Sequence, residues 1–162
     1  MNLCHDRFHS PIGPLTVAAG PDGIRHLLFA SSRRWPPGHA DWRHAPAELA
    51  AARRQLLAWL AGERTVFELP LDLHGTPFQL RVWQVLAGIP YAATRSYRDI
   101  AVAIGQPAAV RAVGLAIGRN PVPLLVPCHR VLASDGRLGG YSGGLAVKQQ
   151  LLAVERRHGP AS

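Results

Sequence analysis

With 162 residues, 48% apolar content and two distant cysteines, Cys4 and Cys128, the chain has room for a real core but no disulfide framework. It contains neither a signal-peptide core nor the roughly 20 consecutive apolar residues that cross a bilayer, so we expect a soluble, cytoplasmic protein. The net charge of +8 is divided unevenly, because residues 1–74 carry +1 and residues 75–162 carry +7. This asymmetry indicates a polyanionic partner for the C-terminal half, with a solubilising surface as the alternative.

Three short stretches with the pattern of strands open the chain. Residues 3–9, 15–19 and 24–29 are separated by the turn-forming sequences Ser-Pro-Ile-Gly and Gly-Pro-Asp-Gly. Short segments bounded by such turns predict strands. We therefore expect a small antiparallel sheet at the N-terminus.

The rest of the N-terminal half contains one clear helix. Residues 31–45 are rich in Pro, Trp, His and Arg and predict a surface loop. Pro46 begins a segment whose apolar residues follow the 3.6-residue period and which stops at Gly62, so we expect a helix there. Residues 66–73 are a candidate strand.

A domain boundary is predicted at His74-Gly75, and a helix follows it. Thr76 is the expected N-cap of this helix, and Gln79 closes a capping box. Trp83 is expected to pack in the core, with stacking on a nucleic-acid base as the alternative.

Two short helices joined by a tight turn come next. Ser96 is the expected N-cap of the first, with Asp99 at the matching capping-box position. Gly105-Gln106-Pro107 breaks the chain, and residues 108–118 have the apolar period of a second helix. This is the pattern of a helix-turn-helix, whose second helix usually meets DNA.

The exposed face predicted for that second helix is unusual for a major-groove reader. It offers Ala109, Ala112 and Arg111, and it lacks the Asn and Gln side chains that read base edges. Small side chains allow close approach, and one arginine can fill the gap left by a displaced nucleotide. The pattern favours minor-groove or lesion binding. The alternative is a helix pair packed within the domain, with Arg111 in an ion pair.

Cys128 stands in the most distinctive stretch of the sequence. The proline-containing, apolar residues 120–127 before it predict a buried extended segment. His129 and Arg130 make its expected surroundings cationic, and positive charge lowers a cysteine pKa from about 8.5, which generates the nucleophilic thiolate. The polar, glycine-rich residues 134–144 can fold over a ligand. The alternative is a small cysteine buried in a core strand.

Residues 144–157 predict a last helix, which carries Glu155. A carboxylate there could orient His129 so that His129 accepts the Cys128 proton, directly or through a water. An ion pair between Glu155 and an arginine is the plain alternative.

Taken together, these residues resemble the O6-alkylguanine-DNA alkyltransferases, which are self-inactivating DNA repair proteins. The resemblance covers about half of the chain and rests on ordered motifs. The motifs are Thr76-Pro77-Phe78-Gln79, Arg95-Ser96-Tyr97, Ala109-Val110-Arg111-Ala112-Val113-Gly114, Asn120-Pro121, Pro127-Cys128-His129-Arg130-Val131 and Tyr141-Ser142-Gly143-Gly144. The Pro-Cys-His-Arg core with its upstream Asn-Pro is highly specific, whereas the N-terminal half matches only loosely.

The resemblance implies an α/β fold in two domains. Residues 1–74 would form a structural domain, a small antiparallel sheet with a helix, similar to ribonuclease H. Residues 75–162 would form a mainly helical domain with a winged-helix-like helix-turn-helix, which binds DNA and accepts the alkyl group.

The resemblance also assigns catalytic roles. Cys128 would be the alkyl acceptor, His129 the base acting through a water, and Glu155 the carboxylate that orients it. Tyr97 would donate a proton or hydrogen bond to the purine ring. Asn120 would brace the turn that joins the second helix to the active-site strand.

Other residues would hold the DNA and the base. Arg111 would be the finger that replaces the flipped nucleotide. The remaining DNA contacts would come from Ala109, Ala112, Gly114 and Ser96. Val131 and Ser142 would contact the base through backbone groups, and Tyr141 would wall the pocket.

The implied activity is that of a methylated-DNA–protein-cysteine methyltransferase. It would move an alkyl group, methyl first, from O6 of guanine in duplex DNA to Cys128, once and irreversibly, after nucleotide flipping. The resemblance also admits O4 of thymine as the donor. No cofactor is implied, and the protein is expected to be a monomer that can cluster on DNA.

A structural zinc is found in some members of the family. Cys4, His26 and His74 lie near comparable places in this chain, but Pro21 occupies the region of the second cysteine. Three candidate ligands without regular spacing are a weak pattern, so we expect no metal.

Three other functions compete with alkyl transfer. The first is a non-catalytic, alkyltransferase-like protein that binds lesions; such proteins replace the acceptor cysteine, which this chain keeps. The second is a cysteine hydrolase built on Cys128, His129 and Glu155, which would require turnover. The third is a plain helix-turn-helix regulator, which leaves the Cys128 stretch unexplained.

Overall fold

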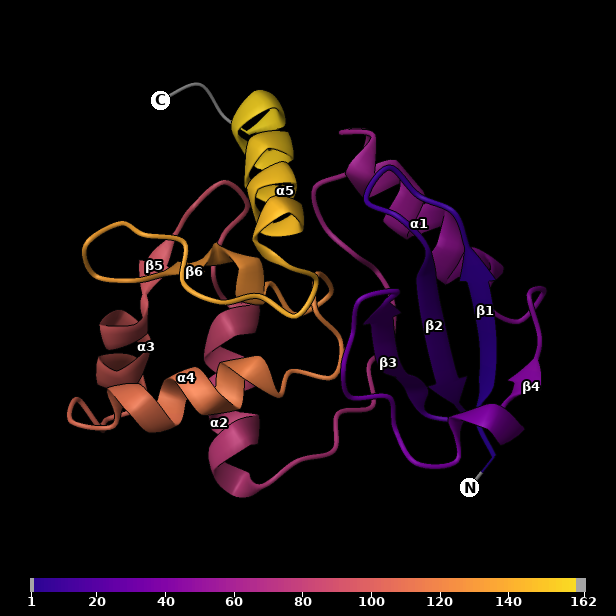
Figure 1. The fold of residues 1–162 in the computed structure, drawn as a ribbon, viewed down its shortest axis with the longest axis horizontal. Coiled ribbons are helices and arrows are strands. Elements are labelled where there is room, and N and C mark those ends of the chain that lie inside the picture. The colour runs from indigo at the N-terminus through magenta and orange to yellow at the C-terminus, as the bar shows by residue number, and fades with distance from the viewer. Residues whose placement is uncertain (1, 160–162) are drawn as a thin grey trace.

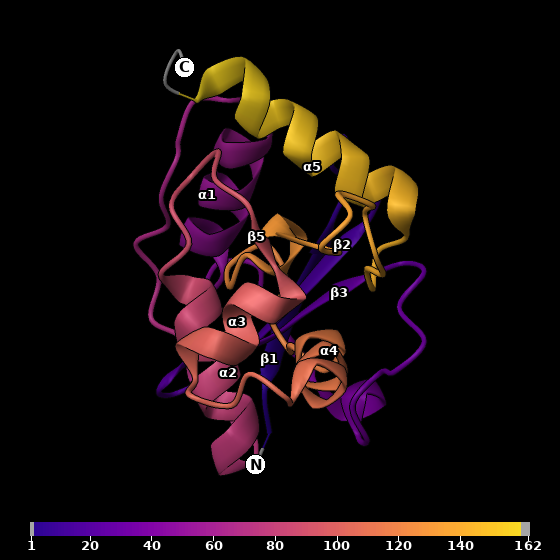
Figure 2. The same ribbon diagram turned by 90° about the vertical axis from the view of Figure 1, so that its left-hand side faces the viewer.

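The computed structural model describes residues 2–159, which form two neighbouring parts (Figure 1). A four-stranded sheet and helix α1 (Ala50–Leu60) lie on one side, and the helices α2 (Pro77–Ala87), α3 (Tyr97–Ala103) and α4 (Val110–Gly118) lie on the other. Figure 2 shows the last helix, α5 (Leu145–His158), running across one end of the molecule. No helix within residues 2–159 is long and apolar enough to cross a membrane.

The predicted antiparallel sheet is confirmed. Strands β1 (Cys4–Phe8), β2 (Leu15–Gly20) and β3 (Gly23–Phe29) pair as an antiparallel meander, with a shift in the β2–β3 register between Ala18 and Ala19. Their buried positions are mostly apolar, including the fully buried Leu15, although Asp6 and Thr16 are buried as well. In β1 the burial alternates along the strand, which specifies the face that turns inward.

The segment predicted as a surface loop, residues 31–45, ends in a short strand instead. The strand β4 (Arg43–His44) pairs in parallel with β1 and completes the sheet order β3-β2-β1-β4. Two backbone hydrogen bonds hold it, from Arg43 to Leu3 at 3.0 Å and from Ala45 to His5 at 2.9 Å. The end of this loop therefore pairs with the edge of β1 that β2 leaves open.

The candidate strand at residues 66–73 does not form. This segment makes a single bridge between Leu71 and Ile24, flanked by hydrogen bonds from Ile24 to Pro70 and from Asp72 to Ile24, both 2.9 Å. Proline has no amide hydrogen, so Pro70 interrupts a ladder that would need one. The prediction of a strand was wrong for this reason.

The helices begin and end close to where the sequence predicts. Thr76 and Gln79 form the expected capping box on α2, and Ser96 and Asp99 form the one on α3. In the N-terminal half, α1 starts four residues after Pro46, because the intervening residues form turns. The helix-turn-helix arrangement of α3 and α4 is confirmed.

One continuous apolar core contains residues from both halves of the chain. Trp83 belongs to it: the residue is only 2% exposed, and its indole N–H donates to the Ala116 carbonyl at 2.9 Å. The core-packing interpretation of Trp83 is therefore confirmed. The division into domains at residue 74 stays a prediction.

The burial of Trp83 predicts a loss of stability in the variant Trp83→Phe. It removes a buried hydrogen bond and part of a ring, so the free energy of unfolding in urea should fall by about 1–3 kcal/mol. The control Val66→Ala changes a side chain that is 61% exposed, and it should shift that free energy by no more than about 0.5 kcal/mol. Unchanged stability in Trp83→Phe together with weaker DNA binding would favour the stacking alternative.

Candidate active site

The cysteine of the most distinctive stretch begins a tight turn. Cys128–Arg130 is a short 3-10 helix, and the strand β6 (Val131–Leu132) follows it directly. β6 pairs in parallel with β5 (Arg95–Ser96), which leads into α3. This pairing places the turn next to the start of the helix-turn-helix.

The segment before Cys128 is buried as predicted, but it is not extended. It folds back on itself, with a hydrogen bond from Val126 to Val122 at 2.9 Å and with Leu124 in the left-handed region at φ 77°. Asn120 braces this loop: its side-chain amide donates to Val126 at 2.9 Å, and its oxygen accepts from Val122 at 3.0 Å. The three prolines of this segment, Pro121, Pro123 and Pro127, lack amide hydrogens and prevent a regular ladder here.

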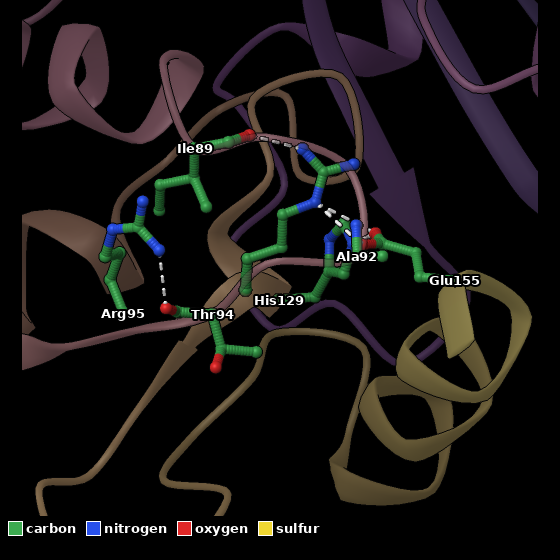
Figure 3. A network of polar contacts seen from close by, with 7 residues as sticks. Ile89, Ala92, Thr94, Arg95, His129 and Glu155 are labelled. Atoms are coloured by element: carbon green, nitrogen blue, oxygen red, sulfur yellow. Dashed lines mark hydrogen bonds and ion pairs between the residues drawn. The ribbon is translucent and has the colours of Figure 1, made fainter. Parts of the chain in front are cut away.

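Glu155 on α5 organises the charged part of the site. Its carboxylate, in a residue only 1% exposed, accepts hydrogen bonds from His129 Nε2, from Arg130 Nε at 2.9 Å and from the Ala92 amide at 2.7 Å. Figure 3 shows Glu155 reaching from α5 toward His129 and Ala92. Arg130 also donates to the Ile89 carbonyl at 2.7 Å. The sequence left two roles open for Glu155, a contact with His129 or an ion pair with an arginine. In the structure the carboxylate makes both contacts, with His129 and with Arg130.

The protonation states of Glu155 and His129 follow from their surroundings. Burial alone would raise the pKa of Glu155, but the hydrogen bond from His129 and the charge of Arg130 hold it below its ordinary value. Burial lowers the pKa of His129, and this outweighs the opposing effect of Glu155. A neutral His129 must donate from Nε2 to the ionised carboxylate. Its Nδ1 atom then carries the lone pair, and no described residue hydrogen-bonds to that atom.

The expectation of an ionised Cys128 was wrong. Burial raises the pKa of Cys128 to about 11, although a hydrogen bond from Asn120, the charge of Lys148 and the backbone amides of Cys128 and Leu124 all oppose the rise. The neighbouring Arg130 is committed to Glu155 rather than to the sulfur. Desolvation of the charged form is therefore the largest effect on the thiol.

Two tyrosines lie close to the sulfur. Tyr97, the first residue of α3, is half-buried, and burial raises its pKa against the effect of a hydrogen bond from the Gly140 backbone. Burial likewise raises the pKa of Tyr141 well above its ordinary value. The negative charge that Cys128 would carry adds to both shifts. Both phenols are therefore neutral and can donate a proton or hydrogen bond.

Two residues were predicted to contact the base through backbone groups: Val131, which lies in β6, and Ser142, which follows Tyr141 in the sequence. Val131 is fully buried in β6, and its carbonyl already accepts a hydrogen bond from Lys148 at 2.7 Å. Ser142 is exposed and lines a groove beside α4.

The predicted DNA-facing residues gather on α4 and before α3. Arg111 and Ala112 are exposed, whereas Ala109 and Gly114 are half-buried. Ser96 is also half-buried, and its hydroxyl is already engaged as the helix cap. The ion pair proposed as an alternative for Arg111 is not found among the described residues.

A groove of about 1130 Å³ runs between α4 and the N-terminal half. It is bordered by Gly114 and Arg119 on one side, by Arg33 and Arg34 on the other, and by Tyr141 at the edge. The basic lining therefore draws on both halves of the chain, which the charge asymmetry alone did not indicate. Cys128 does not line this groove, and the residue is only 5% exposed.

Two site residues escaped the sequence reasoning. Trp59 of α1 is fully buried, and its ring meets the His129 ring edge-on at 5.7 Å, so the N-terminal half contributes to the site. Lys148 is fully buried beside Cys128. The spacing of Lys148, Leu151 and Glu155 at i, i+3 and i+7 could have revealed that both charges share the buried face of α5.

The three candidate zinc ligands do not converge. Cys4 donates to the Ala19 carbonyl at 3.5 Å, His26 stacks on Trp42, and His74 pairs with Asp72 at 3.0 Å. Within residues 2–159, no group of three or more His, Cys, Asp or Glu side chains could hold a metal ion.

Two family models together match most of the chain. Residues 4–73 match the ribonuclease-like domain of 6-O-methylguanine DNA methyltransferase, and residues 77–157 match its DNA-binding domain.

Individual proteins are similar over nearly the full length. A methylated-DNA–protein-cysteine methyltransferase from Mycolicibacterium paratuberculosis is 52% identical over 153 residues, which cover 94% of this chain and 92% of the relative. A constitutive one from Bacillus subtilis is 46% identical, covering 91% and 92%. The crystal structure of Mycobacterium tuberculosis OGT in complex with DNA has a TM-score of 0.90 and 46% identity, covering 96% of this chain and 94% of that one.

The Glu155 network predicts a pH-dependent loss of stability. Because folding lowers the pKa of Glu155, the stability it contributes is present above its ordinary pKa of 4.5 and is lost as the pH falls below that value. Glu155→Gln leaves Arg130 buried without a carboxylate, so the free energy of unfolding at pH 7 should fall by about 3–5 kcal/mol. Urea unfolding between pH 3 and 7, roughly the carboxyl titration range, measures both effects. If the free energy of unfolding of Glu155→Gln depends on pH as steeply as that of the wild type, the pH dependence does not come from Glu155.

Proposed function

Since the chain belongs to the 6-O-methylguanine DNA methyltransferase family, we propose that it repairs DNA by moving an alkyl group, methyl first, from O6 of guanine to the sulfur of Cys128. The observation that carries this proposal is the buried hydrogen bond between Glu155 and His129, the residue directly after Cys128. With the sulfur of Cys128, this pair can supply a nucleophile, a base and an orienting carboxylate.

The proton of Cys128 has to leave as the sulfur attacks. Because burial raises the pKa of Cys128 to about 11, the sulfur is mostly protonated at pH 7. A neutral His129 with a free Nδ1 can take this proton, and Glu155 stabilises the imidazolium that forms. No direct hydrogen bond joins Cys128 to His129 among the described residues, so we propose that a bridging water carries the proton.

The leaving guanine needs a proton or hydrogen bond in return. Tyr97 lies beside the sulfur with a raised pKa, so it remains a neutral donor at pH 7. The S–C bond forms as the C–O6 bond breaks, and the electrons of that bond stay on the purine. A hydrogen bond from Tyr97 to the ring stabilises that charge.

The surface of α4 supports close contact with a duplex. A Cβ atom at Gly114 would come no nearer than 3.9 Å to Tyr97, and at Gly118 it would meet nothing within 4 Å. Glycine costs a helix about 1 kcal/mol relative to alanine, and packing inside this protein does not require it. We propose that these glycines let the DNA backbone approach, with Arg111 occupying the place of the flipped nucleotide.

The product of attack is a thioether, which is stable. We propose that each molecule therefore acts once. No cofactor is needed, because the lesion itself supplies the alkyl group. We also propose that the protein acts as a monomer in the cytoplasm. Ala109, Ala112 and Ser96 would contact the DNA, and Val131, Tyr141 and Ser142 would hold the base. A lesion-binding protein without transfer is the second candidate, but Cys128 with its base and carboxylate favours transfer.

The decisive test uses duplex DNA containing O6-methylguanine. Peptide mass spectrometry should find one added methyl group, on Cys128, and at most one per protein molecule. Cys128→Ser should bind the same DNA without accepting the methyl group. A folded wild-type protein that leaves Cys128 unmodified would contradict the proposed activity and favour the lesion-binding alternative.

The variant Arg111→Ala tests the finger role. Single-turnover repair of duplex DNA should slow by roughly 10- to 100-fold, because an interaction that fills the stack is lost. Reaction with free O6-benzylguanine, which requires no flipping, should stay at the wild-type rate. Equal losses on both substrates would remove the finger role. Arg98→Ala, an exposed arginine of α3, serves as the control for lost charge.

A further inference from the structure

Lys148 is the only lysine in a chain that contains 17 arginines, and it is fully buried. A buried ammonium ion is unfavourable unless its N–H groups find acceptors. Every other long basic side chain of this protein is an arginine. The contrast indicates that this position requires the compact ammonium group and not positive charge alone.

The contacts of Lys148 satisfy that requirement. Its Nζ atom donates to the backbone carbonyls of Val131 at 2.7 Å, of Gly140 at 3.2 Å and of Leu138. Three acceptors match the three N–H groups of an ammonium ion. One acceptor belongs to β6, directly after the Cys128 turn, and two belong to the glycine-rich segment. Lys148 thus joins three parts of the chain at one point.

The segment that Lys148 holds lies against Tyr97. Gly139 has φ 69°, and a Cβ atom there would come within 2.6 Å of the Tyr97 hydroxyl. The next aromatic residue, Tyr141, packs its ring against Phe29 at 5.6 Å and forms part of the groove wall. Residues 138–140 are therefore fastened by Lys148 on one side and contact the proposed proton donor on the other.

Arginine could not make the same connection. Its guanidinium is planar and directs its donors within one plane, whereas the three carbonyls accept from a single nitrogen atom. The ammonium ion also opposes the burial effect on the Cys128 thiol, so its charge favours the attacking form of the sulfur.

We infer that Lys148 is a positioning residue for alkyl transfer: its three carbonyl hydrogen bonds hold residues 138–140 against Tyr97 and β6, so that the base pocket beside Cys128 is formed before the lesion enters. This inference rests on the proposed function. Positioning of this kind acts on the base and not on the DNA duplex. Loss of Lys148 should therefore impair reaction with the free base as much as with DNA, unlike loss of Arg111.

The test compares Lys148→Met and Lys148→Arg in single-turnover reactions with duplex O6-methylguanine DNA and with free O6-benzylguanine. Both variants should react about 10²-fold more slowly with both substrates, because a displaced pocket wall misaligns the base. Amide hydrogen exchange of residues 138–144 should become about tenfold faster in both. Wild-type rates and protection in Lys148→Arg would show that charge alone suffices and would overturn the positioning role.

The control is Arg137→Ala, which removes one positive charge from the same segment. This side chain is 87% exposed and pairs only with Asp135 among the described residues. The variant should react with O6-benzylguanine at the wild-type rate. If wild-type protein transfers no methyl group, the proposed function fails; if it does and Lys148→Met reacts equally fast, only the inference about Lys148 fails.

A measurement on the unaltered protein covers the case that both variants fail to fold. Because the chain has one lysine, ¹⁵N-lysine labelling yields a single side-chain ammonium signal in NMR spectra. Three hydrogen bonds in a buried site should make the ammonium protons of Lys148 exchange slowly with water. The signal should therefore persist at about pH 7 and about 25 °C. A signal lost to rapid exchange would contradict the connection to the 138–140 segment.

Discussion

The carboxylate of Glu155 is the interaction on which the rest of the site depends. It is buried, and it receives hydrogen bonds from His129, Arg130 and the Ala92 amide. A buried charge is tolerated only when such partners surround it. Meeting that requirement draws α5, the Cys128 turn and the loop after α2 to one point. The same contacts that satisfy the charge therefore set the tautomer and orientation of His129, so the stability of this region and its chemistry have a common cause.

Burial also determines how the sulfur can react. A cysteine exposed among cations would be ionised at rest and open to any electrophile. Cys128 instead is only 5% exposed, and burial raises its pKa to about 11, so the thiol is the favoured form of the sulfur. Such a thiol needs a base before it can attack, which is the role that we propose for His129. Hydrogen bonds from Asn120 and the strained Leu124 backbone reduce the cost of forming the thiolate without removing the need for a base.

The N-terminal half takes part in the site, although its sequence contains no catalytic pattern. Trp59 packs edge-on against His129, and Phe29 supports the ring of Tyr141. Arg33 and Arg34 border the groove opposite α4. One apolar core joins the two halves of the chain. Residues distant from Cys128 in sequence therefore pack against His129 and against Tyr141 of the groove wall.

Local patterns in the sequence were sufficient for most elements and for the chemistry of the site. Turn residues bounded the strands, capping boxes marked α2 and α3, and the Pro-Cys-His-Arg motif identified the nucleophile, because each signal depends on near neighbours in the chain. The bridge at Leu71, the turn before Cys128, its raised pKa and the roles of Trp59 and Lys148 came only from the tertiary structure. Burial and long-range contacts decide these features, and neither can be read from the residues beside them. The sequence of this protein by itself marked the candidate reactive groups, and its folding decided how deeply they are buried and which partners they meet.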